Sequence, residues 1–68
     1  MENPDKYVGH IVCLKQHVFQ RIMTHARRQG ITLDNRFLVA TASHKLRKLV
    51  CYGADYRVTV SVSEVALV

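Results

Sequence analysis

Three residues near the start of the chain have the types and spacing of metal ligands. His10, Cys13 and His17 form the pattern His-x2-Cys-x3-His, and histidine nitrogen and cysteine sulfur are donors that zinc prefers. On a helix these side chains would project within about 60° of one another. A closed zinc site needs a fourth ligand, however, and the nearest candidates, His44 and Cys51, are distant and belong to no ligand pair. We therefore expect neither a metal nor another cofactor, and we interpret the histidines as ordinary polar residues.

The same histidines and thiols are the only conspicuous candidates for catalytic bases and nucleophiles. No spacing in the chain assembles a nucleophile, a base and an orienting group, and 68 residues leave little volume for a substrate pocket. We expect the protein not to be an enzyme. The two cysteines, and a beginning without a basic-then-apolar signal pattern, predict a reduced cytoplasmic protein with free thiols. No apolar run approaches the roughly 18 residues that would span a bilayer, so we expect no membrane association.

The charge of the chain is its main clue to function. Ten Lys and Arg stand against five Asp and Glu, a formal net charge of +5, which makes a polyanion such as DNA or RNA the first partner to consider. The acidic residues fall near the ends and junctions of the expected elements, so the bodies of those elements are positive. Six cations are the predicted phosphate contacts: Arg21, Arg27, Arg28, Lys45, Arg47 and Lys48.

The first of these cations lie on a long predicted helix, residues 4–29. Asn3 is a suitable N-cap, Pro4 suits the first helical position, and Gly30 is a suitable stop. At 100° per residue one face is apolar, with Tyr7, Val8, Ile11, Leu14, Val18, Phe19, Ile22 and Ala26. The alternative is that "YVGHIVCL" forms a strand before a shorter helix that starts near Lys15. We favour the long helix.

The remaining cations lie on a second predicted helix, residues 35–52, with Asp34 as its cap. Its apolar stripe is Leu38, Val39, Ala42, Leu46, Leu49 and Val50. The alternative is that "RFLVATA" and "KLRKLVCY" form two strands, and the helical reading leaves Phe37 on the polar side. We favour the helix because six apolar positions fit one stripe.

A strand is expected at about residues 55–63, after the turn-like Gly53-Ala54-Asp55. "YRVTVSVS" alternates strictly, with Tyr56, Val58, Val60 and Val62 on one side. The run from Ser61 to Glu64 fits a capping box and predicts a short helical turn. Because a lone strand needs a ladder partner, we expect these four residues to pair with the same strand of a second copy, in a homodimer.

Together these patterns predict one small domain, residues 1–68, of class α+β, with two amphipathic helices followed by a C-terminal strand. The function that we expect is that of a small basic nucleic-acid-binding protein, accessory or regulatory, that contacts phosphates through its helix faces. The alternative is a protein-interaction module, a compact inhibitor or adaptor, that docks on an acidic protein through a strand edge or its basic face.

Overall fold

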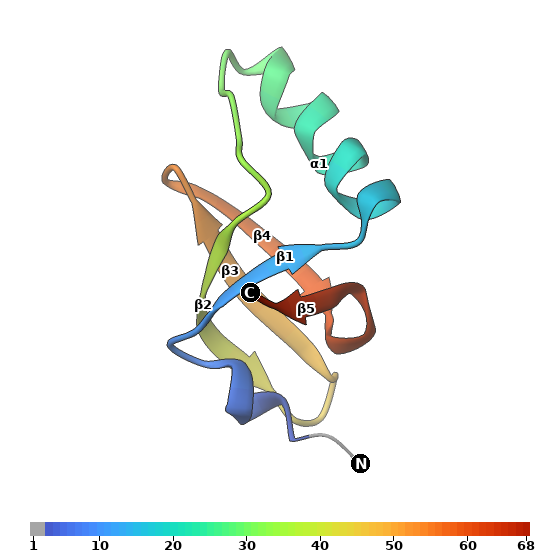
Figure 1. Ribbon diagram of the computed structural model, residues 1–68, viewed down its shortest axis with the longest axis vertical. Helices are drawn as coiled ribbons and strands as arrows, with labels where there is room; N and C mark the ends of the chain where they lie inside the picture. The colour runs from blue at the N-terminus through green and yellow to red at the C-terminus, as the bar shows by residue number, and fades with distance from the viewer. Residues whose placement is uncertain (1–2) are drawn as a thin grey trace.

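The computed structural model describes residues 3–68, which form one α-helix and a five-stranded antiparallel sheet. The strands lie in the order β4-β3-β2-β1-β5, so the last strand pairs with the first (Figure 1). The 3-10 turn η1 precedes β1, and η2 connects β4 to β5. The bounds are η1 (Pro4–Tyr7), β1 (Ile11–Leu14), α1 (Gln16–Arg28), β2 (Phe37–Ser43), β3 (Lys48–Gly53), β4 (Tyr56–Ser61), η2 (Val62–Glu64) and β5 (Val65–Leu67).

The expected fold class, two helices and a C-terminal strand, is therefore wrong, because the chain is mostly β. The predicted helix 35–52 is the hairpin of β2 and β3. Its strand period buries Phe37 completely, together with Val39 and Leu49, whereas Leu38 and Leu46 from the predicted helical stripe are exposed. The rejected alternative of two strands is correct, because only an extended backbone places Phe37 in the core.

The predicted helix 4–29 is divided into three elements. The cap at Asn3 is confirmed, since its side chain accepts a hydrogen bond from the Asp5 N–H (3.0 Å), but η1 ends at Tyr7. Gly9 then takes a φ of +83°, which redirects the backbone into β1. The stop at Gly30 is also confirmed, with a φ of +76° two residues after α1 ends. The shorter helix, starting at Gln16, is the correct alternative.

The predicted dimer strand is paired within the chain. β4 pairs along its whole length with β3, and Val58, Val60 and Val62 are buried while Tyr56 packs against the core. The unpaired strand on which the homodimer prediction rested does not exist in this fold. The capping box is confirmed: Ser61 N–H donates to Glu64 Oε1 (2.8 Å) at the start of η2.

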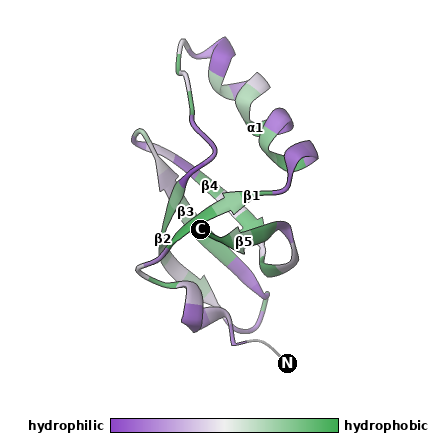
Figure 2. Ribbon diagram, in the orientation of Figure 1, coloured by the Kyte–Doolittle hydropathy of each residue, from purple (hydrophilic) through white to green (hydrophobic). Residues whose placement is uncertain are grey.

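The core lies between the inner side of the curved sheet and α1. Val18 and Ala26 of α1 are fully buried, and Phe19 meets Phe37 of β2 edge to face, with 6.3 Å between ring centroids. Figure 2 shows the resulting division, with hydrophobic strands and a largely hydrophilic helix. The rest of the buried cluster comes from η1, the loop after α1 and the strands, and includes Tyr7, Val12, Leu14, Leu33, Val39, Leu49, Cys51 and Val65.

Asn35 fixes the point at which β1 ends and α1 starts. Its Oδ1 accepts from the Leu14 N–H (2.7 Å), and its Nδ2 donates to the Leu14 carbonyl (2.8 Å). The side-chain amide thus makes the pair of bonds that a neighbouring strand residue would make. It extends the contact between β1 and the segment before β2, and so holds the first turn of α1 beside the sheet.

Candidate nucleic-acid interface

The polar face of α1 carries positive charge and no acidic residue. All eight polar residues of α1 are exposed, and none is acidic: Gln16, His17, Gln20, Arg21, Thr24, His25, Arg27 and Arg28. We call these residues the basic helix face. The five apolar residues of α1 are buried or half-buried, so packing against the core determines which side faces solvent.

The helix owes its position to both of its ends. Asn35 holds the chain that enters it, and Gly30 allows the chain to turn back after Arg28. Arg27 and Arg28 lie in the last turn, where cations interact favourably with the helix dipole. The helix dipole therefore accounts for the presence of both arginines. It does not account for the absence of Asp and Glu from the other polar positions of α1.

Arg21 differs from the other two arginines in having an acidic neighbour. Its guanidinium lies 4.0 Å from Glu64 Oε2, a long and exposed contact that joins α1 to η2. Such pairs contribute little to stability, and Glu64 also accepts the Ser61 N–H. Substitutions of Arg27 and Arg28 are thus the best test of what the positive charge of the basic helix face contributes to binding.

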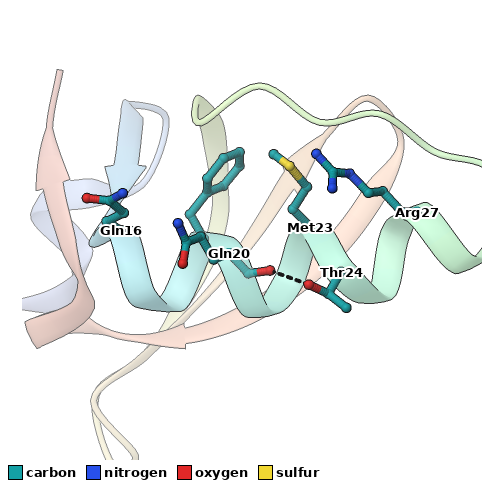
Figure 3. A pocket seen from close by; sticks show the side chains of 6 residues that line it. Gln16, Gln20, Met23, Thr24 and Arg27 are labelled. Atoms are coloured by element: carbon teal, nitrogen blue, oxygen red, sulfur yellow. Dashed lines mark hydrogen bonds between the residues drawn. The ribbon is translucent and has the colours of Figure 1, made fainter.

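A shallow groove of about 430 Å³ runs along one flank of the basic helix face (Figure 3). Half-buried Phe19 and Met23 give it apolar surface, and Arg27 lies at one end. The Thr24 hydroxyl donates to the Gln20 carbonyl (2.9 Å), as the dashed line shows. The groove thus combines apolar surface with amide groups and a cation; its other lining residue is Gln16.

The other three predicted contacts lie elsewhere. Lys45 and Arg47 belong to the turn between β2 and β3, and Lys48 begins β3. The C-terminal end of α1 and this turn lie toward opposite ends of the molecule's long axis, which extends 36 Å (Figure 1). The six predicted cations therefore form two separate groups, not one patch.

Arg47 has a structural role in its turn. Its φ is +53°, and its carbonyl accepts the Val62 N–H (3.1 Å), which joins the turn to η2. Beside it, His44 Nε2 lies 2.6 Å from Asp5 Oδ2 and ties the turn to η1. We therefore treat Lys45 and Lys48 as the cations of this region that can be replaced without disturbing the turn.

The candidate zinc ligands are not brought together. His10 precedes β1, Cys13 lies within β1 and His17 lies in α1, so the helical spacing that would align them is absent. Among residues 3–68 no three His, Cys, Asp or Glu side chains form a group suited to a metal. Both cysteines are free thiols, and burial raises the pKa of the Cys51 thiol to about 11.

Sequence reasoning missed a second surface, because it assigned β2 and β3 to a helix. The strand register aligns four outward side chains in one row across β1, β2, β3 and β4: Ile11, Leu38, Tyr52 and Arg57. The first three are 43%, 45% and 43% exposed. We call the side of the sheet that carries this row the outer sheet face. The sequence would have revealed this surface only if residues 35–52 had been assigned to strands, in which alternate side chains share one side.

Comparison of the chain with family models, with curated proteins and with solved structures finds no match. In the described residues, no helix is both long and apolar enough to cross a membrane. The two surfaces themselves are therefore the features of this protein from which a function can be inferred.

Proposed function

We propose that this protein is a small nucleic-acid-binding protein, accessory or regulatory in role, that contacts phosphates through the basic helix face. The main support is the composition of α1, which exposes three arginines and two histidines and contains no acidic residue. Each Lys or Arg that meets a phosphate releases condensed counterions, and this supplies affinity without any sequence motif.

The placement of the acidic residues supports the same proposal. Neither α1 nor any of the five strands contains Asp or Glu. Asp5 lies in η1 beside His44, and Glu64 lies in η2. Negative charge is thus kept to turns, loops and the chain start. Because Glu64 lies beside Arg21, a polyanion on α1 would meet the least repulsion at Arg27 and Arg28.

The test compares two double variants that remove the same charge from different places. Arg27→Gln with Arg28→Gln removes two positive charges from the basic helix face and keeps good helix formers. Lys45→Gln with Lys48→Gln is the matched control in the duplex assay, since it removes two charges at the far end of the molecule. Lys48 lies on the outer side of β3, so the two variants are compared with duplex DNA and not with single strands. Arg21 and Arg47 are left in place because both have structural contacts.

Binding is measured by fluorescence anisotropy with labelled duplex DNA, single-stranded DNA and RNA over a salt series. We expect log affinity to fall linearly with log salt for the unaltered protein. The helix variant should lower the steepness of that fall by about 1.8 for duplex or about 1.4 for single strands, because two phosphate contacts are lost. Equal losses in both variants would show that only net charge matters, and no binding at low salt would reject the proposal.

A second candidate function has one specific observation in its favour. In residues 3–68, β4 lies at an edge of the sheet and pairs only with β3, and such an edge can accept a strand from an acidic partner protein. A partner that remains bound through nuclease treatment and high salt would favour this protein-interaction role over nucleic-acid binding.

A further inference from the structure

We infer that the outer sheet face is a second binding surface, on which unpaired bases of a single-stranded nucleic acid stack against Tyr52. This inference rests on the proposal that the chain binds nucleic acid, and it names the class of nucleic acid. It assigns different tasks to the two surfaces: α1 contacts phosphates, and the sheet contacts bases.

The row at the centre of the outer sheet face is unusual for a solvated surface. Three apolar side chains on three neighbouring strands are each more than two-fifths exposed, and they are directly adjacent in the register: Ile11, Leu38 and Tyr52. With strands about 4.8 Å apart, the row from Ile11 to Arg57 spans about 14 Å. The core does not need these residues, because Val12, Phe37 and Cys51 fill the opposite side of the same strands.

Among the Phe and Tyr rings of the described residues, Tyr52 is the only one that is exposed. Phe37 is fully buried and Tyr7 is nearly so, while Phe19 and Tyr56 are partly buried and pack against the core. The Tyr52 ring lies between apolar Leu38 and cationic Arg57 in the register. A base can stack on such a ring while its phosphate approaches the guanidinium, which is the arrangement that single-strand-binding sheets use.

Charge decides between a nucleic acid and a second copy of the chain as the occupant. Arg57 lies in the row, and Lys48 lies on the same side of β3 as Tyr52, four residues earlier. The strands carry no acidic residue to oppose them. Two copies packed through this face would bring cations toward cations, whereas a polyanion would meet them favourably.

The chain contains no tryptophan, so Tyr52→Trp introduces a single fluorescent reporter at the proposed stacking position. The probes are a short oligothymidylate, a strand of equal length without bases, and a duplex. We expect the oligothymidylate to quench the tryptophan and the other two probes to leave it nearly unchanged. Leu46→Trp, at an exposed position on the turn between β2 and β3, is the matched control and should show no quenching.

Affinity provides the second readout. Tyr52→Ala should weaken binding of the oligothymidylate between about fivefold and about a hundredfold, and Tyr52→Phe should restore it, because the ring provides the stacking. Binding of the strand without bases should not change. Circular dichroism confirms that each variant is folded.

Two results would overturn the inference and leave the proposed function intact. One is an unquenched Tyr52→Trp reporter while anisotropy still reports binding. The other is emission that changes with protein concentration alone, which would assign the outer sheet face to pairing between copies. If the unaltered protein binds none of the three probes, the duplex included, both proposals fail.

Discussion

The amide of Asn35 should contribute a large part of the stability of this small domain. It makes two hydrogen bonds, of 2.7 and 2.8 Å, to the N–H and carbonyl of Leu14, a residue that is only 3% exposed. At about 1 kcal/mol for each bond, Asn35→Ala should lower the free energy of unfolding by about 2 kcal/mol. For a domain of this size that corresponds to a fall in Tm of about 8–16 °C.

Asn35→Asp isolates one of the two bonds. A carboxylate can accept from the Leu14 N–H, but it cannot donate to the Leu14 carbonyl and places a negative oxygen beside it. At neutral pH we expect the aspartate variant to be no more stable than the alanine variant. Below about pH 4 the protonated carboxyl regains a donor, so the aspartate variant should gain stability relative to alanine at the same pH.

Thermal unfolding followed by circular dichroism measures both variants. The reasoning is refuted if Asn35→Ala changes the free energy of unfolding by less than about 0.5 kcal/mol, the range of an ordinary surface substitution. It is also refuted if Asn35→Asp matches the unaltered protein at neutral pH, since the bond to the carbonyl would then contribute nothing.

Three further predictions concern packing, thiol chemistry and capping. Gly53→Ala should cost about 1–3 kcal/mol in urea unfolding, because the new Cβ would lie 2.7 Å from the buried ring of Phe37; an unchanged midpoint would mean that the ring moves freely. Cys51, whose pKa burial raises to about 11, should resist alkylation at pH 8 in the folded protein while half-buried Cys13 reacts, and equal rates in mass spectrometry would contradict this. Glu64→Ala should cost about 0.5–2 kcal/mol in thermal unfolding through loss of the capping box, with Glu64→Gln as the milder control.

The two predicted groups of cations show how a fold error changes a candidate site. Arg27 and Arg28 lie on a real amphipathic helix, so their exposure was predictable from the helical period. Lys45 and Lys48 were placed on a second helix face, but Lys45 lies in the turn between β2 and β3 and Lys48 begins β3, toward the other end of the molecule. The residues of each group lie near one another in the fold, but the two groups do not share one surface.

Signals that act within a few residues were readable from the sequence alone. The cap at Asn3, the stop at Gly30 and the capping box from Ser61 to Glu64 all depend on contacts between near neighbours, and all are present. The alternation from Tyr56 to Val62 also predicted a strand directly, because a period of two has no helical equivalent.

Only the tertiary structure decided the state of residues 35–52 and, with it, the outer sheet face. Their apolar positions fit a helical stripe as well as two strands, so local pattern could not choose between them. The choice is made by distant contacts: β2 pairs with both β1 and β3, and Phe37 completes a core shared with α1. The same pairing turns Tyr52 outward. Successive side chains of a strand point to opposite sides, and the neighbouring Cys51 side chain is buried in the core.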